Sequence, residues 1–101
     1  MKTTTVDVDQ IKNTISQHLD FLSENYNVDK IGVFGSITRG DNSDKSDVDM
    51  LVELSEPISL FKFIELEEFL SKVLGKKVDL VTEKALKSAI KDEILRETVY
   101  V

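Results

Sequence analysis

The sequence contains no cysteine and no tryptophan, only one proline and four glycines, and these absences exclude several classes of protein. Without cysteine there are no disulfides and no thiolate metal sites, a composition typical of cytoplasmic proteins. No apolar run approaches the ~20 residues of a membrane span, and none follows the first residues, so we expect neither a membrane helix nor a signal peptide. Two nucleotide-binding motifs are also missing, Gly-x-x-x-x-Gly-Lys-Ser/Thr and Gly-x-Gly-x-x-Gly.

The composition predicts one soluble, folded domain over residues 1–101, with 41% hydrophobic and 32% charged residues. Its net charge is −6, and the acidic excess is local, because residues 31–57 carry six acidic but only two basic side chains. An acidic surface repels a nucleic-acid backbone, so we expect no direct binding of DNA or RNA. An acidic cluster does accept a nucleotide when Mg²⁺ neutralises it.

Hydrophobic periodicity changes along the chain between the helical and the strand repeat. The expected helices are 8–25, 60–74 and 83–97, and the expected strands are 30–34, 47–54 and 77–82. Asp7 or Asp9 and Thr82 are expected as N-caps, and Gly75 as the end of the second helix. The loop between the first two strands is too short for a crossover helix. We therefore expect an α/β or α+β domain, with a small mixed sheet flanked by helices.

The aromatic residues of the second helix raise a separate question, because they are suited either to a core or to stacking on a base. We expect the core role for Phe61, Phe63 and Phe69, and for Ile64 beside them.

The most informative segment begins with Gly35-Ser36 and continues, after ten residues, with Asp47-Val48-Asp49. On a strand, Asp47 and Asp49 point to the same side with Cα atoms ~6.6–6.8 Å apart, where they repel each other unless a cation lies between them. Mg²⁺ is the natural candidate. Asp79, on another expected strand, would complete a site for two ions ~3.5–4 Å apart, as used for displacement at phosphorus. The alternative is that these acids only face solvent.

The first half of this segment is suited to holding phosphate. Gly35 permits close approach of the backbone to a ligand, and Ser36 supplies a hydroxyl. Arg39 is placed to bind phosphate oxygens with two hydrogen bonds, although a surface salt bridge with Asp41 or Asp44 is an alternative.

These residues resemble a known family. Gly-Ser, ten residues and Asp-x-Asp match the signature of the DNA-polymerase-β-like nucleotidyltransferases. The stretches SDVDMLVEL at 46–54, KKVDLVTE at 76–83 and ILRETVYV at 94–101 resemble its minimal members, the MNT antitoxins of HEPN–MNT toxin–antitoxin pairs. The resemblance implies the nucleotidyltransferase fold.

The resemblance also implies roles for the residues. Asp47 and Asp49 would bind Mg²⁺ and a nucleoside triphosphate, Gly35 and Ser36 would hold the phosphates, and Asp79 would activate the attacking hydroxyl. In these antitoxins ATP donates AMP to a tyrosine of a HEPN ribonuclease toxin, which is thereby silenced. A toxin encoded nearby and a hetero-oligomer with it are implied as well.

Chain length supports a separate acceptor protein, because 101 residues leave no room for an acceptor-binding domain. We expect the face that carries the acids, with Leu51 beside them, to be partly open for this partner. Two other functions are weighed: an antitoxin that neutralises by stoichiometric binding alone, and a nucleotidyltransferase that modifies a small molecule such as an antibiotic.

Overall fold

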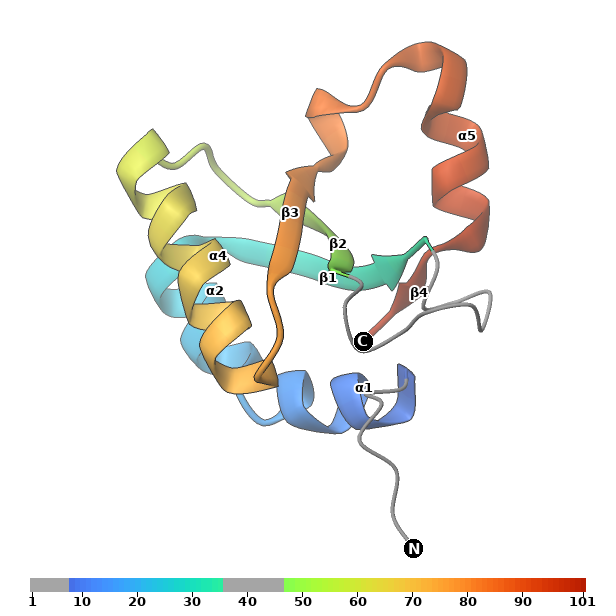
Figure 1. The fold of residues 1–101 in the computed structure, drawn as a ribbon. Coiled ribbons are helices and arrows are strands. Elements are labelled where there is room, and N and C mark those ends of the chain that lie inside the picture. Colours follow the sequence, from blue (N-terminus) through green and yellow to red (C-terminus); the bar gives the residue numbers. More distant parts are fainter. Residues whose placement is uncertain (1–7, 36–46) are drawn as a thin grey trace, which may run out of the picture.

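The computed structural model describes residues 8–35 and 47–101, which form a mixed four-stranded sheet with helices (Figure 1). The elements are α1 (Val8–Ser16), α2 (Leu19–Tyr26), β1 (Val28–Phe34), β2 (Val48–Leu54), α4 (Leu60–Leu74), β3 (Val78–Thr82), the short 3₁₀ helix η1 (Glu83–Ala85), α5 (Ser88–Glu97) and β4 (Val99–Tyr100). The expected fold class is confirmed. No helix among the described residues is both long and apolar enough to cross a membrane.

The strand order is β3-β2-β1-β4. β1 and β2 follow each other in the chain and are antiparallel, as the short connection in the sequence predicts. β2 and β3 are parallel, and α4 is the crossover that a parallel pair requires. β4 adds an antiparallel edge strand beside β1.

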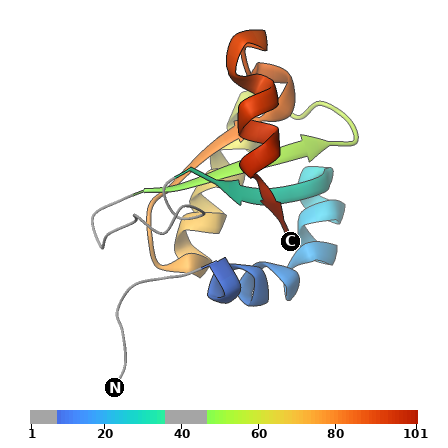
Figure 2. The same ribbon diagram turned by 90° about the vertical axis from the view of Figure 1, so that its right-hand side faces the viewer.

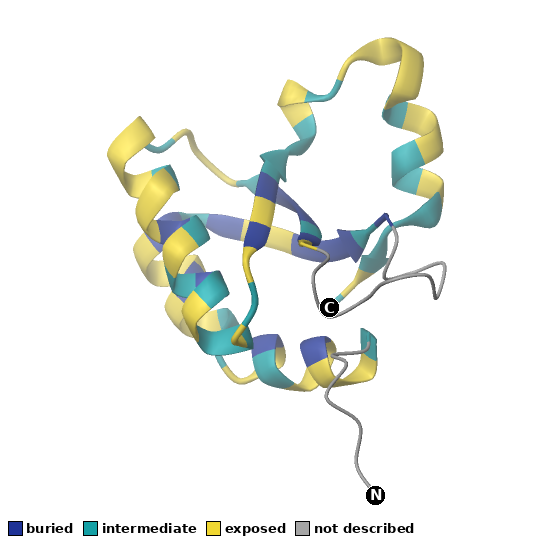
Figure 3. Cartoon of the chain, in the orientation of Figure 1, coloured by how far each residue is buried: buried dark blue, intermediate teal, exposed yellow. Residues whose placement is uncertain are grey.

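The core lies on the face of the sheet that α1, α2 and α4 cover, whereas α5 lies on the other side (Figures 1 and 2). β2 is largely buried (Figure 3), and its alternation decides which side chains join this core, since Val48, Met50 and Val52 belong to the core cluster and are almost completely buried. Ile11 and Leu66 reach the same core from the helices. Each such side chain stabilises the fold by about 1.5–3 kcal/mol relative to an exposed one.

α4 begins and ends where the sequence predicts. The Ser59 hydroxyl accepts a hydrogen bond from the Lys62 backbone N–H at 3.1 Å, which satisfies one free donor of the first turn. Gly75 ends the helix at φ 71° and donates its N–H to the Ser71 carbonyl. The crossover that carries the chain from β2 to β3 is therefore fixed at both ends.

Two predicted helices differ from the observed ones. The single helix expected over 8–25 is divided at residues 17–18 into α1 and α2, and the His18 ring packs edge-on against Phe69, with centroids 5.4 Å apart. The helix expected over 83–97 is η1 followed by α5, and Thr82 makes no side-chain cap. Asp9 lies within the first turn of α1, and Asp7 lies outside the described residues.

The expected core role is also wrong for part of α4. Phe63 and Phe69 are partly buried against the core, but Phe61 is 81% exposed and Ile64 is 42% exposed. The reason is position: the start of α4 extends past the sheet, so only Leu66 and Leu70 of this helix are fully buried.

Candidate active site

The turn after β1 brings Gly35 against Asp49. Gly35 has φ 82°, a left-handed conformation that side chains other than glycine rarely adopt. The register of the sheet pairs Phe34 with Asp49, and a Cβ atom placed on Gly35 would collide with the Asp49 Oδ2 atom. The first glycine of the Gly-Ser motif is therefore required by both backbone angle and space.

The parallel pairing of β2 with β3 places Asp49 directly beside Asp79. Paired residues on neighbouring strands point to the same face, and the strands are ~4.8 Å apart. This face is the one opposite the helices of the core. Asp79 is exposed and Asp49 is half-buried, while Asp47 lies exposed one residue before β2. The sheet thus brings together, near the start of β2 and β3, two acids that are thirty positions apart in the chain.

The donor set can be compared with the needs of Mg²⁺. Among residues 8–35 and 47–101, no group of three His, Cys, Asp or Glu side chains is arranged to hold a metal ion. Two carboxylates on adjacent strands are nevertheless the ligands that Mg²⁺ takes from a protein when substrate phosphates and waters complete its shell. The pair Asp49 and Asp79 fits an ion that arrives with a nucleotide, and the metal-binding role of Asp47 stays a prediction.

The remaining phosphate-binding predictions fall on Ser36 and Arg39. Both lie outside the described residues, and their contacts with phosphate stay predictions.

The structure adds Glu97, for which the sequence pattern predicts no role. Its Oε1 atom accepts a hydrogen bond from the Gly35 backbone N–H at 2.8 Å. The only signal in the sequence was its place at the end of an expected helix, which does not predict contact with a turn 62 positions away. Gly35 is thus in contact with carboxylates from two different elements, β2 and α5.

A second pair of acids lies further along the same face, on Glu53 and Glu83. Burial, followed by a hydrogen bond with the Glu83 carboxyl, raises the pKa of Glu53. Burial also raises the pKa of Tyr100, and the charges of Glu53 and Glu83 add to this effect. The Lys91 ammonium lies 3.8 Å from the Glu83 carboxylate. This cluster is separate from the Asp49–Asp79 pair.

Leu51 lies between these two groups of acids and is fully buried. The face that carries the acids is partly open at Asp79, which is exposed, but it is closed at Leu51. Leu51 lies on the inner strand β2, between Gly32 of β1 and Val81 of β3.

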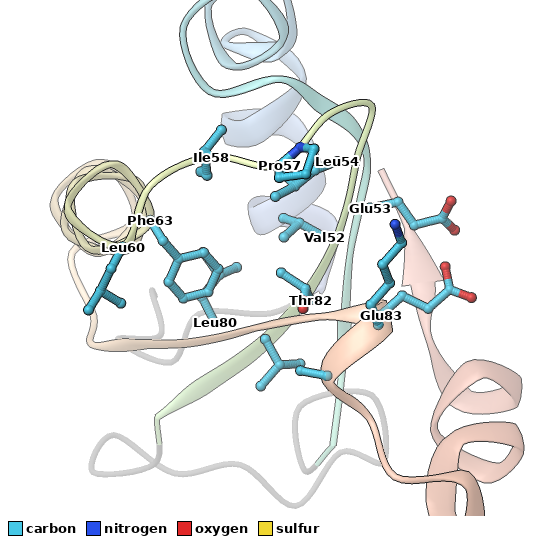
Figure 4. A pocket seen from close by; sticks show the side chains of 13 residues that line it. Val52, Glu53, Leu54, Pro57, Ile58, Leu60, Phe63, Leu80, Thr82 and Glu83 are labelled. Atoms are coloured by element: carbon cyan, nitrogen blue, oxygen red, sulfur yellow. The ribbon is translucent and has the colours of Figure 1, made fainter.

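An apolar pocket of about 630 Å³ opens at the far ends of β2 and β3 (Figure 4). Val52 and Leu80 line it from the sheet and Phe63 from α4. Val52 and Leu80 are odd numbers of residues from Asp49 and Asp79, so their side chains point to the opposite face. These two side chains therefore open the pocket toward the core face, although Glu53 and Val81 also line it.

Comparison with known proteins gives consistent matches. The family model described as nucleotidyltransferase domain matches residues 15–101. A protein from Thermococcus cleftensis, named protein adenylyltransferase MntA, is 49% identical over 94 residues, which cover 93% of this chain and 95% of that protein.

Two solved structures share the fold. One is described as a minimal nucleotidyltransferase; it is 28% identical, with a TM-score of 0.76, and the match covers 96% of this chain and 98% of that one. The other belongs to a toxin–antitoxin complex with AMP-PNP; it is 23% identical, with a TM-score of 0.71, and the match covers 88% of this chain and 70% of that one.

Proposed function

Because the chain belongs to the nucleotidyltransferase domain family, we propose that it is an antitoxin that transfers AMP from ATP to a tyrosine of a HEPN-type ribonuclease toxin. The observation that carries this proposal is the pairing of Asp49 with Asp79 beside the Gly35 turn. The similar protein that is named protein adenylyltransferase supports a protein as the acceptor. The chain would act in the cytoplasm, in a hetero-oligomer with a toxin encoded nearby.

In the proposed reaction the tyrosine oxygen attacks the α-phosphorus of ATP, and the bond from that phosphorus to the bridging oxygen of pyrophosphate breaks. Asp79 takes the phenolic proton, and pyrophosphate carries away the electron pair of the broken bond. Asp47 and Asp49 would hold Mg²⁺, which would supply positive charge to neutralise the triphosphate. Ser36 and Arg39 hold the phosphate oxygens, and Gly35 lets the backbone approach them closely.

The test is to express the toxin together with this chain and to measure the mass of the toxin. A tyrosine carrying one or more AMP units is the expected result. The double variant Asp47→Asn/Asp49→Asn should lower the rate of transfer by about three decades, since each decade corresponds to ~1.4 kcal/mol of lost stabilisation. Asp92→Asn is the matched control, because Asp92 is an exposed acid on α5. Equal AMP transfer by the double variant would refute the proposal.

One observation favours a second function, neutralisation by binding alone. Leu60 and Phe61 are 71% and 81% exposed, and Ile64 follows on the same helix, so α4 carries an apolar surface that requires no carboxylate. Exposed apolar patches often mark protein interfaces. If the double variant protects cells from the toxin as well as the wild type does, and the toxin stays unmodified, binding alone is the function.

A further inference from the structure

α5 is held to the domain by a few polar contacts. None of its residues is buried, and it stands away from the sheet on the side opposite the core (Figures 1 and 2). Its described ties are the hydrogen bond from Gly35 to Glu97, the ion pair of Lys91 with Glu83, and strand β4, which directly follows the helix. One of these few contacts is therefore made with Gly35, the glycine of the candidate active site.

The Glu97 carboxylate takes the place of a strand hydrogen bond. β4 pairs with β1 so that Gly32 faces Tyr100 and Val33 faces Val99. Continuing this antiparallel register brings Gly35 opposite Glu97, where the α5 helix has replaced the strand. The Gly35 N–H is satisfied by a side-chain carboxylate instead of a backbone carbonyl. Hydrogen bonds to a charged acceptor are roughly twice as strong as neutral ones.

We propose that Glu97 is a positioning residue for the nucleotide site. The Glu97 carboxylate holds the turn at Gly35 in place through its hydrogen bond with the Gly35 N–H. The same turn packs against the Asp49 carboxylate. A carboxylate on a phosphate-binding glycine could instead compete with phosphate. Competition predicts that removal of the Glu97 carboxylate tightens ATP binding, whereas the positioning role predicts that it weakens ATP binding. This inference rests on the proposed function.

The experiment compares three substitutions at Glu97 by calorimetry of ATP binding in the presence of Mg²⁺ and by steady-state AMP transfer. Glu97→Ala removes the acceptor, and we expect the Kd and KM for ATP to rise about tenfold, with kcat at saturating ATP nearly unchanged. Glu97→Gln keeps an acceptor oxygen at the same reach and should stay within about threefold of wild type. Glu97→Asp keeps the charge but shortens the side chain, and should bind as weakly as Glu97→Ala.

Glu93→Ala is the matched control, because it removes an exposed carboxylate one turn earlier on the same helix and changes the net charge equally. Its ATP binding should be unchanged. The amide resonance of Gly35 in nitrogen-15 NMR spectra should move in Glu97→Ala and Glu97→Asp but not in Glu93→Ala.

Each result decides the inference. Unchanged ATP binding by Glu97→Ala overturns it, and tighter binding shows competition instead. If Glu97→Ala does not fold, weaker binding by Glu97→Gln than by Glu97→Asp overturns it, because charge rather than the hydrogen bond would then matter. A wild-type chain that binds no ATP with Mg²⁺ refutes the proposed function and with it this role, whereas equal binding by wild type and Glu97→Ala refutes this role alone.

Discussion

Substitution of Gly35 by alanine adds a Cβ atom that should destabilise the fold in two ways, through backbone strain and through a collision with Asp49. The left-handed backbone at φ 82° costs a residue with a Cβ about 1–2 kcal/mol. The same Cβ would collide with the Asp49 Oδ2 atom, so the carboxylate must leave its rotamer, which costs about 0.5–1.5 kcal/mol more. We therefore expect Gly35→Ala to lower the free energy of unfolding by roughly 1.5–3.5 kcal/mol and, because Asp49 moves from its place beside Asp79, to slow AMP transfer by two decades or more.

Gly75→Ala is the control for the backbone effect. Gly75 has φ 71°, but a Cβ there meets nothing within 4 Å. It should cost only about 1–2 kcal/mol, or about 4–8 °C in Tm for each kcal/mol, and leave AMP transfer intact. In an Asp49→Ala background the collision is gone, so Gly35→Ala should cost no more than Gly75→Ala, measured by urea unfolding. Wild-type transfer by Gly35→Ala, or equal costs of both alanines in the wild-type background, would refute the reasoning.

Three further outcomes are expected. Burial and the hydrogen bond with Glu83 raise the pKa of Glu53 in the folded protein. The native state therefore holds a proton that the unfolded state has already released. The stability that this proton contributes is present below the pKa of Glu53 in the unfolded chain and is lost as pH rises through its pKa in the folded protein. Urea unfolding from about pH 4 to 7 should show this loss in the wild type and not in Glu53→Gln, and parallel profiles would contradict it. Leu66→Ala in the buried core should lower the free energy of unfolding by about 2–5 kcal/mol, whereas Leu60→Ala on the exposed start of the same helix should change it by less than ~0.5 kcal/mol. Similar losses for both variants in urea unfolding would contradict the difference in burial. ATP should raise the Tm with Mg²⁺ present and not after chelation, while the protein without nucleotide melts at the same temperature in both; a Tm shift by ATP after chelation would exclude the metal-assisted site.

The parts of the fold that sequence predicts well are those where local pattern and tertiary packing agree. In β2, Val48, Met50 and Val52 alternate with Asp49 and Glu53 on the opposite face except at Leu51, and these three apolar residues are buried as the alternation predicts. α4 has a capping serine before it and a glycine after it, and its bounds are as expected. The prediction failed at residues 17–18, where the helical spacing of apolar residues continues but the helix is interrupted between α1 and α2. The spacing of apolar residues does not reveal such an interruption. The two-residue strand β4 carries too short a pattern to be recognised.

In the candidate site, too, some features follow from local sequence pattern and others depend on how the strands pair. The spacing of Gly35 and Asp49 identifies the motif, and the alternation of β2 predicts which face Asp49 takes. That Asp79 lies beside Asp49 depends on a parallel register, which no local signal encodes. Glu97 depends on the register of β4 against β1, and was missed for that reason.

The crossover through α4 has a kinetic consequence. Asp49 and Asp79 approach each other only when β3 docks on β2, and this contact closes a loop of thirty residues, which is entropically costly early in folding. A ligand held between the two strands stabilises an arrangement that forms late and is lost first. ATP with Mg²⁺ should therefore lengthen the lifetime of the native state by slowing its unfolding, and leave the rate of refolding almost unchanged.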